Sequence, residues 1–221
     1  MSEKLGTALV WYRNDLRTLD HQGLKKAVES GHKVVAYYTF NPNHYKTLSL
    51  GFKKTDQFRA QFLIESVQAL QQALKSLNIT LIIDTKTPDH GLPEWIKKFR
   101  VKEIYLQHEW TEEERKEEKA VSEKIDSNIT WKRHYEQFLF HPSDLPFSRS
   151  QIPEIFGAFR KRCEKEVQVR QLLPSPKALP PHNRVDVDDK SPTLADLGIP
   201  PIENDKRSAF PFLGGTKAAL E

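Results

Sequence analysis

The chain has 221 residues, of which 38% are hydrophobic, and a formal net charge of +4 from 34 basic and 30 acidic residues. This length is sufficient to bury the core of one domain, and the weak, evenly spread charge excludes a dedicated acidic or basic tail. A single cysteine excludes an internal disulfide, and no apolar run is long enough to span a bilayer. Strand-like sequence also begins too close to the N-terminus for a signal peptide. We therefore expect a cytoplasmic monomer without a membrane segment.

The first part of the chain alternates short apolar runs with amphipathic stretches. A strand is predicted at 8–12 (ALVWY), then a helix at 21–30 that ends before Gly31, a residue type favoured at helix C-termini. A second strand at 34–40 precedes a long helix at 56–77. The spacing of apolar residues in this long helix predicts a buried face made of Phe58, Phe62, Leu63, Val67, Leu70 and Leu74.

The same alternation continues to residue 131. Strands are predicted at 79–83, 103–106 and 129–131, with helices at 92–99 and 111–125 between them. Strands that alternate with helices favour right-handed crossovers and a parallel sheet covered on both faces. The predicted fold is therefore α/β: a doubly wound, five-stranded parallel sheet in three layers, Rossmann-like or flavodoxin-like.

The loop after the first strand is among the first places to look for a ligand, because ligands of doubly wound sheets lie beyond the carboxyl ends of strands. This loop reads RNDLR, residues 13–17. No GxGxxG or GxxxxGK[ST] motif follows the strand, so nicotinamide and P-loop nucleotide chemistry lose support. The sequence also lacks GxSxG and any histidine spacing typical of metal sites, so no catalytic or metal-binding residue is predicted.

The composition changes from about residue 172. Prolines interrupt a polar segment at 172–209, which we interpret as an interdomain linker that runs over the surface; a disordered tail is the alternative. Residues 210–221 contain two glycines, Gly214 and Gly215, ahead of what reads as the first turn of a helix. We expect the start of a further domain there, and the α/β domain at residues 1–171.

Four stretches together resemble one known family. The opening WYRNDLRTLDHQGLKKA is similar to the start of photolyases and cryptochromes, whose first strand commonly ends in a W[FY]RxDLRxxD pattern. KTDQFRAQFLIESVQAL (54–70) and FHPSDLPFSRSQIPEIFGAFRKRCE (140–164) resemble two segments of the DASH cryptochromes. The closing FLGGTKAAL is similar to the GGExxAL segment that leads into the family's flavin-binding helical domain. The four stretches keep the family's order and cover almost the whole chain.

The resemblance implies that this chain is the antenna domain and linker of a DASH-type cryptochrome or deoxyribodipyrimidine photolyase. In the family this domain carries a light-harvesting chromophore, here expected to be 5,10-methenyltetrahydrofolate, and a larger helical domain holds FAD and most contacts with DNA. The intact protein would use light to repair pyrimidine dimers, mainly in single-stranded DNA, whereas these residues alone would be inactive. Two alternatives stay open: a signalling blue-light receptor without repair activity, and a nucleotide-binding module unrelated to light.

The charged residues of loop 13–17 have two interpretations. They line a ligand crevice, or the guanidinium of Arg13 or Arg17 pairs with the carboxylate of Asp15 or Asp20 and locks the loop. We favour the structural interpretation, because arginine–carboxylate pairs fix geometry well.

The stronger candidate for ligand binding is HEWTEEER, residues 108–115, between the fourth strand and the following helix. Photolyases that bind folate place a carboxylate here against the pterin ring, whose edge offers adjacent N–H donors. By position the candidate carboxylates rank in the order Glu112, Glu109 and Glu113. Three neighbours complete the candidate site. We expect Thr111 to cap the helix and an aromatic neighbour, Trp110 or His108, to contact the ring. The alternative is an acidic first helical turn that the helix dipole favours.

The stretch FRKRCEKEVQVR predicts a basic helix at 159–170. Glutamates interleave its basic residues, so they would partly cancel any neutralisation of phosphates. We interpret it as a solvated helix face and expect only weak, salt-dependent affinity for DNA.

Overall fold

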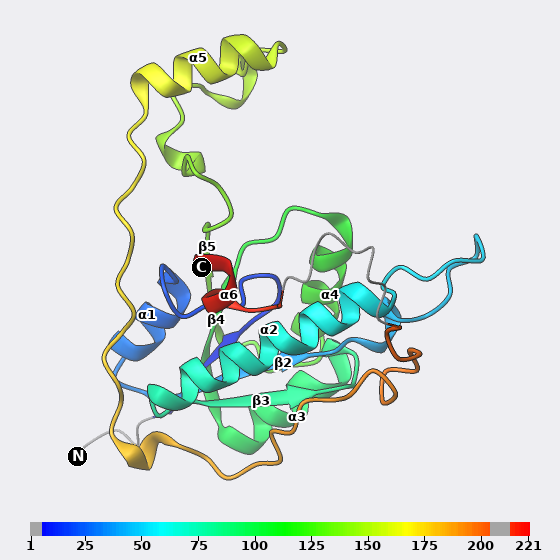
Figure 1. Ribbon diagram of the computed structural model, residues 1–221. Coiled ribbons are helices and arrows are strands. Elements are labelled where there is room, and N and C mark those ends of the chain that lie inside the picture. Colours follow the sequence, from blue (N-terminus) through cyan, green and yellow to red (C-terminus); the bar gives the residue numbers. More distant parts are fainter. Residues whose placement is uncertain (1–5, 204–212) are drawn as a thin grey trace.

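The computed structural model describes residues 6–203 and 213–221, and a sheet of five parallel strands lies at its centre (Figure 1). In chain order the strands and helices are β1 (Thr7–Trp11), α1 (Gln22–Glu29), β2 (Lys33–Thr39), α2 (Gln57–Ser76), β3 (Thr80–Asp84), α3 (Pro88–Phe99), β4 (Val101–Gln107), α4 (Glu112–Ser122), β5 (Thr130–His134), α5 (Phe156–Glu166) and α6 (Thr216–Leu220). Short 3₁₀ helices lie in the connections, at Pro42–His44, Pro142–Asp144, Arg149–Gln151 and Pro181–Asn183.

The strand order in the sheet is β3-β2-β1-β4-β5, and every pairing is parallel. This is the Rossmann order rather than the flavodoxin-like one, so the structure decides between the two predicted alternatives. From β3, at one edge of the sheet, the chain returns through α3 to β4 beside β1. The topological switch therefore lies between the carboxyl ends of β1 and β4, where Trp11 is the register partner of Leu106.

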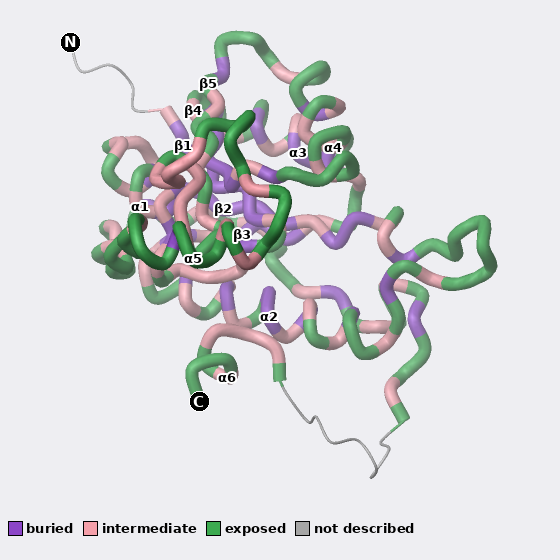
Figure 2. The backbone as a smooth tube through the Cα atoms, turned by 90° about the horizontal axis from the view of Figure 1, so that it is seen from above, coloured by how far each residue is buried: buried purple, intermediate pink, exposed green. Residues whose placement is uncertain are grey.

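Alternate residues of the central strands belong to two separate cores. In and just after β1, Ala8, Val10 and Tyr12 pack with α1 and α2, whereas Leu9 and Trp11 pack with α3 and α4. A strand buried on both faces requires this period of two. Figure 2 shows buried backbone concentrated at the sheet, between the helical layers. The predicted three-layer α/β fold is confirmed. No helix in either layer, or elsewhere in the described residues, has the length and apolarity to cross a membrane.

The buried face of α2 differs from the predicted one. Its buried apolar residues are spaced three or four apart: Ala60, Ile64, Val67, Leu70 and Leu74. The prediction was wrong for Phe58 and Phe62, which are 63% and 48% exposed. At about 100° per residue, Phe58 lies on the side of the helix opposite Val67 and Phe62 lies close to that side. The position of a residue around the helix, and not its aromatic character, therefore determines which side chains of α2 are buried.

Other predicted elements also differ in their bounds, and three of them show this clearly. α3 begins earlier than predicted, at Pro88. A proline is tolerated in the first turn of a helix, because a backbone N–H at this position would have no partner within the helix. β5 continues to His134, because its pairing with β4 extends as far as Gln107. The basic helix predicted at 159–170 is α5, which begins and ends earlier.

Residues 135–171, here called the arm, leave the sheet after β5 and carry α5 away from the rest of the fold (Figure 1). Arg170 closes the base of the arm: its Nε and Nη2 donate to the two carboxylate oxygens of Asp144, at 2.6 and 2.7 Å. Paired bonds between an arginine fork and a carboxylate fix both position and orientation. The segment that leaves the sheet and the segment that returns to it are therefore joined by this ion pair.

The described part of the proline-rich segment, residues 172–203, is bonded to the α/β domain. The buried Asn183 accepts the Val34 N–H through Oδ1 at 2.8 Å, and its Nδ2 donates to the carbonyls of Val34 and Asn78 at 3.0 and 2.8 Å. It thus supplies the bonds that a neighbouring strand would make at the start of β2. The role of linker stays a prediction, and its boundary at residues 209 and 210 lies outside the described residues.

The segment from residue 213 lies against α2 (Figure 2). Gly214 N donates to Glu65 Oε2 at 2.7 Å. A Cβ on Gly214 would collide with the α2 backbone at Phe62 and Ser66. Only glycine permits so close an approach of two backbones.

Candidate functional site

The loop after β1 and the loop after β4 meet at the topological switch. Arg13 Nη2 donates to the backbone carbonyl of Gln107, and its guanidinium carbon lies 4.9 Å from the centre of the Trp11 ring. Asn14 Nδ2 donates to Glu109 Oε1 at 3.5 Å. The two hydrogen bonds join residues that are far apart in sequence. The two loops therefore form one site at the carboxyl edge of the sheet.

Glu109 is enclosed in this site, with 4% of its surface exposed. In addition to the Asn14 bond, Gln107 Nε2 donates to Oε1 at 3.2 Å and Gln137 Nε2 donates to Oε2 at 2.5 Å. A buried carboxylate is costly unless hydrogen bonds satisfy it. Three side-chain amides meet that need, which holds the carboxylate in one orientation.

A pocket of about 290 Å³ opens beside Glu109, and Arg115 and Arg133 also line it. Two buried polar atoms of the same edge, Gln107 Oε1 and Arg13 Nε, have no hydrogen-bond partner within the described residues. Neither residue lines this pocket, so of these groups only the Glu109 carboxylate is brought to it. A carboxylate beside a pocket suits the edge of a polar planar ring that carries N–H donors.

Aromatic side chains stand next to this pocket. His108 packs edge-on against Trp110, with ring centres 5.0 Å apart, and against Tyr135 at 4.8 Å. Trp110 also contacts Phe138 of the arm, with ring centres 5.7 Å apart. Trp110 and Phe138 line an apolar groove of about 500 Å³ along the arm. The structure therefore places the two predicted ring contacts, His108 and Trp110, together and close to Glu109.

The other two candidate glutamates face away from the pocket. Glu112, the first choice from the sequence, has a side chain that is 81% exposed and lies 2.8 Å from Lys116 Nζ. The hydrogen bond with Lys116 lowers the pKa of Glu112. Glu113 pairs with Lys54, and this hydrogen bond lowers its pKa in the same way. The structure thus brings Glu109, and neither Glu112 nor Glu113, to the pocket.

Thr111 stands at the N-cap position of α4, but its side chain makes no capping hydrogen bond. The first turn of α4 contains Glu112, Glu113 and Glu114. Negative charge at this end of a helix is stabilised by the helix dipole. This explains the acidic turn without a ligand, as the alternative interpretation of the sequence proposed.

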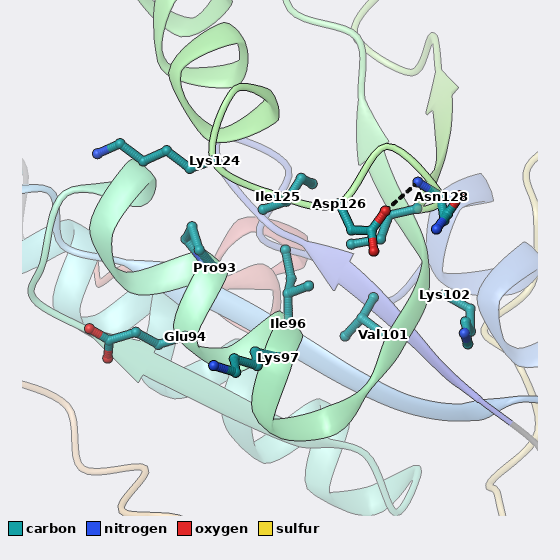
Figure 3. A pocket seen from close by; sticks show the side chains of 11 residues that line it. Pro93, Glu94, Ile96, Lys97, Val101, Lys102, Lys124, Ile125, Asp126 and Asn128 are labelled. Carbon is teal, nitrogen blue, oxygen red and sulfur yellow. Dashed lines mark hydrogen bonds between the residues drawn. The ribbon is translucent and has the colours of Figure 1, made fainter.

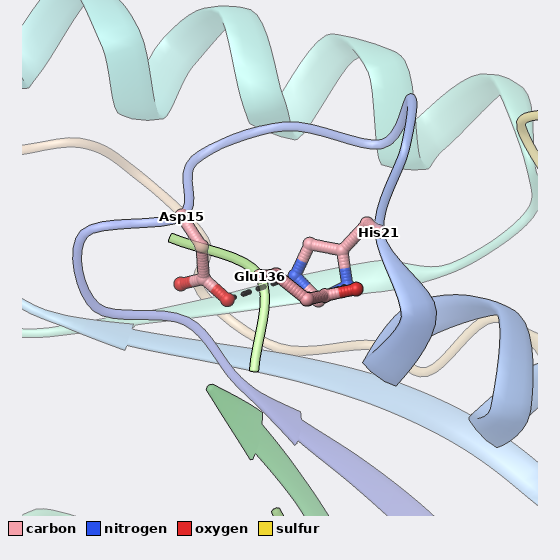
Figure 4. A group of neighbouring side chains, drawn as sticks. All are labelled: Asp15, His21 and Glu136. Carbon is pink, nitrogen blue, oxygen red and sulfur yellow. Dashed lines mark hydrogen bonds and ion pairs between the residues drawn. The ribbon is translucent and has the colours of Figure 1, made fainter. Parts of the chain in front are cut away.

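Asp15, His21 and Glu136 form a buried group behind the first loop (Figure 4). His21 Nε2 lies 2.9 Å from Asp15 Oδ2, and His21 Nδ1 accepts the Leu24 N–H at 2.9 Å. Glu136 accepts the backbone N–H of Gln22. One nitrogen of His21 therefore caps α1 while the other fixes Asp15. The loop after β1 is locked to the start of the first helix.

Burial acts on all three acidic groups around His21. It raises the pKa of Glu136, with a partial offset from His21. It also acts upward on Asp15, but hydrogen bonds from His21 and from the Arg13 backbone outweigh it, so the pKa of Asp15 lies below its ordinary value. Burial, together with the charges of Asp15 and Glu136, holds the pKa of Tyr12 well above its ordinary value. Asp15 is therefore the carboxyl that stays ionised most readily.

The same three side chains are close enough to hold one metal ion, because their possible ligand atoms lie within 4.8 Å of one another. Their hydrogen bonds argue against this use. A neutral histidine that binds a metal through one nitrogen carries its proton on the other and donates it. His21 Nδ1 instead accepts a backbone N–H, and Nε2 faces Asp15. We interpret the group as structural, and the absence of a metal site stays a prediction.

The hydrogen bonds that hold loop 13–17 differ from the arginine–carboxylate pairs predicted from the sequence. Arg17 Nη2 donates to the backbone carbonyl of Asp20 at 3.0 Å, rather than to a carboxylate. Asp15 accepts the backbone N–H of Arg13 at 3.0 Å and bonds His21. The predicted guanidinium–carboxylate pairs were wrong, because His21 already occupies the Asp15 carboxylate. Arg13 and Arg17 still hold the loop through backbone carbonyls, and Arg13 Nη1 also lies 3.6 Å from the Glu118 carboxylate.

Sequence reasoning missed the three amides that surround Glu109. Gln107 offered a signal, since it is a polar residue that directly follows the apolar run at 104–106. Asn14 was considered only as part of loop 13–17, without a role of its own. Gln137 offered no local signal, because the sheet topology alone brings it beside Glu109.

A second cavity, of about 540 Å³, lies at the opposite edge of the sheet, where β4 and β5 begin (Figure 3). Its walls include the apolar side chains of Ile96, Val101 and Ile129. The ammonium groups of Lys97 and Lys124 point away from it. Ligands of doubly wound sheets bind at the carboxyl edge. We therefore assign no function to this cavity.

The Rossmann-type sheet defines an α/β domain with a candidate ligand site at its carboxyl edge. Residues 8–181 match the family model for DNA photolyase. Because this match covers most of the chain, the chain belongs to the DNA photolyase family. The resemblance inferred from the four sequence stretches is confirmed.

The chain is similar to several cryptochromes. Cryptochrome DASH of Gloeobacter violaceus is 37% identical over 215 residues, which cover 97% of this chain and 43% of that protein. The blue-light photoreceptor PHR2 of Arabidopsis thaliana is 34% identical, and the match covers 96% of this chain and 48% of that protein. The crystal structure of a Synechocystis cryptochrome matches with a TM-score of 0.89 and 34% identity, covering 100% of this chain and 46% of that one. The chain thus spans less than half the length of these relatives.

Proposed function

We propose that this chain is the antenna domain of a DASH-type cryptochrome or photolyase, and that the edge between β1 and β4 binds 5,10-methenyltetrahydrofolate. The observation that carries the proposal is the carboxylate of Glu109, buried beside a pocket of about 290 Å³ at the topological switch. The similarity to DASH cryptochromes supports a role in light capture.

The side chains at this edge fit a pterin ring. Its adjacent N–H donors match the oxygens of the Glu109 carboxylate, which lies beside the pocket. His108 and Trp110 supply aromatic surface for the ring face. The bound folate would supply absorption of near-ultraviolet or blue light. The residues of this chain bind it, orient it and exclude water. The contacts predicted from the sequence for Thr111, Glu112 and Glu113 stay second candidates, although none of the three lines the pocket.

For the longer protein we propose light-dependent repair of pyrimidine dimers, mainly in single-stranded DNA, with FAD in a helical domain beyond this chain. A cytoplasmic location belongs to the same proposal. The second candidate function is blue-light signalling without repair, which the similarity to the photoreceptor PHR2 favours. Repair of a dimer-containing single strand by the longer protein under blue light distinguishes the two functions.

A titration of this chain with two ligands tests the class of ligand. We expect methenyltetrahydrofolate to bind weakly but saturably, as followed by its fluorescence, because the family completes the folate site with residues of the helical domain. ATP should not bind in calorimetry, because no phosphate-binding glycine loop follows β1. Binding of ATP without binding of folate would replace the proposal with a nucleotide-binding module.

A further inference from the structure

The pocket beside Glu109 has a buried side and an exposed side. Glu109 lines it with only 4% of its surface exposed, whereas the basic residues that line it are exposed: Arg115, Lys119 and Arg133. A ligand that reaches the buried carboxylate therefore passes basic side chains at the opening. Oε2 of Glu109 accepts one hydrogen bond, from Gln137, so it keeps an acceptor position for an N–H of such a ligand.

The exposed side of the pocket follows one face of α4. Four residues of the helix line the pocket at spacings of three and four: Arg115, Glu118, Lys119 and Ser122. Residues at these spacings share one side of a helix. From Arg115 to Ser122 the helix rises about 10 Å, at about 1.5 Å per residue. This face is therefore long enough for the outer part of an extended ligand.

The acidic residue on this face is already paired. Glu118 Oε1 accepts a hydrogen bond from Arg133 Nε at 2.6 Å, and its Oε2 lies 3.6 Å from Arg13 Nη1. The two guanidinium groups offset the charge of Glu118, and the bond to Glu118 holds Arg133 in place. Glu118 and Arg133 therefore form a wall of the pocket, in which neither charge is left over for a ligand.

Arg115 and Lys119 are the basic side chains of the pocket that keep their charge for a ligand. Within the described part of the chain, the Arg115 side chain makes no hydrogen bond or ion pair. Glu112, three residues before Arg115, pairs with Lys116 instead. Lys119 Nζ lies 3.8 Å from Glu123, and both side chains are largely exposed. An exposed pair of this kind contributes little in water.

The two free basic side chains suit carboxylates. An arginine fork binds a carboxylate through two parallel hydrogen bonds, and a lysine ammonium adds a point charge. Arg115 and Lys119 are four residues apart, so they lie one helical turn apart on the same face of α4. Two neighbouring carboxylates can therefore be bound at once.

We propose that Arg115 and Lys119 bind the negatively charged end of the ligand whose N–H donors engage Glu109. This inference rests on the proposed function of the site. It narrows the ligand to a molecule with N–H donors at one end and two carboxylates at the other. Folate has this form, because its pterin ring is joined through a benzoyl group to a glutamate, here called the tail.

A comparison of two ligands tests the tail contact in the unchanged protein. The second ligand is the diamide of methenyltetrahydrofolate, in which neutral carboxamides of almost the same size replace both tail carboxylates. We expect the wild-type chain to bind the folate about three- to ten-fold more tightly than the diamide at low salt, the order of two exposed ion pairs. Fluorescence titration measures both affinities, and high salt should reduce the difference between them.

Substitutions assign the contact to the two residues. The double variant Arg115→Gln/Lys119→Gln should bind the folate and the diamide equally. Lys116→Gln is the control, because Lys116 lies on the same helix and is exposed but does not line the pocket. This control should keep the preference for the folate over the diamide.

The outcomes separate the tail contact from the proposed function. If the wild-type chain binds both ligands equally, or if the preference for the folate persists in the double variant, the tail contact is overturned. Saturable binding of folate that Glu109→Gln removes would then still support the proposed function. If the wild-type chain binds neither ligand, both fail together.

Discussion

At the scale of single residues, the site depends on partners that are distant in sequence. The stretch HEWTEEER contains every candidate glutamate, but its spacing alone ranked Glu112 above Glu109. The difference arises from where β4 ends. Gln107 is the last strand residue, so Glu109 still lies at the edge of the sheet, whereas Glu112 begins α4 and faces solvent. Such an orientation follows from strand register and loop path, which a local pattern does not contain.

Asn183 gives an energetic test of how the proline-rich segment is attached. Asn183→Ala removes three hydrogen bonds and leaves the buried N–H of Val34 without its partner. We expect the unfolding free energy to fall by about 1–3 kcal/mol, the usual order for a buried group left unsatisfied. Urea unfolding measures the change. The exposed Asn128→Ala is the control and should change stability by less than about 0.5 kcal/mol. Equal effects of the two changes would refute the account of this attachment.

His134 gives a test of pH dependence. Burial lowers the pKa of His134 from 6.5 to about 4, with smaller effects of His21, Lys26 and Lys132. As the pH falls, the unfolded chain binds a proton near pH 6.5 before the folded chain does, so stability is lost between about pH 6.5 and 4. We expect His134→Gln to lose less stability than wild type between pH 7.5 and 5 in urea unfolding. An equal loss in both proteins would contradict this explanation.

At the scale of elements, buried strands were the most predictable parts of the chain. The run ALVWY is apolar throughout because both faces of β1 are covered. A run of this length is typical of a strand and too short for an ordinary helix. The edge strand β5 was predicted too short, since its exposed residues Lys132 and Arg133 do not have to be apolar. The predicted face of α2 failed at Phe58 and Phe62, where exposed aromatic residues resembled core residues.

A matched pair of substitutions tests the assigned face of α2. Leu70 is 2% exposed and Phe58 is 63% exposed. We expect Leu70→Ala to lower the unfolding free energy by about 2–5 kcal/mol, as for a cavity in a core. Phe58→Ala should cost less than about 1 kcal/mol, although it removes a larger side chain. Thermal or urea unfolding of both variants checks this, and a larger cost for Phe58→Ala would reverse the assignment.

At the scale of the whole molecule, the sequence predicted the alternation of strands and helices but not the strand order. Parallel pairing and right-handed crossovers allow both doubly wound orders. The order β3-β2-β1-β4-β5 is what brings Asn14 and Glu109 together across the switch. The two stretches singled out in the sequence, RNDLR and HEWTEEER, are therefore parts of one site. The chain spans less than half the length of these relatives, and the proposal assigns flavin binding and repair to the longer protein.

The affinity of Glu109 and Glu112 variants for methenyltetrahydrofolate tests the central claim most directly. Both Glu109→Gln and Glu112→Gln remove one negative charge, so they are matched, and circular dichroism would show that both fold. The account predicts that Glu109→Gln weakens binding at least about ten-fold, the order of one charged hydrogen bond, while Glu112→Gln binds like wild type. Loss of binding in Glu112→Gln, with binding retained in Glu109→Gln, would contradict it and return the site to the outer turn of α4.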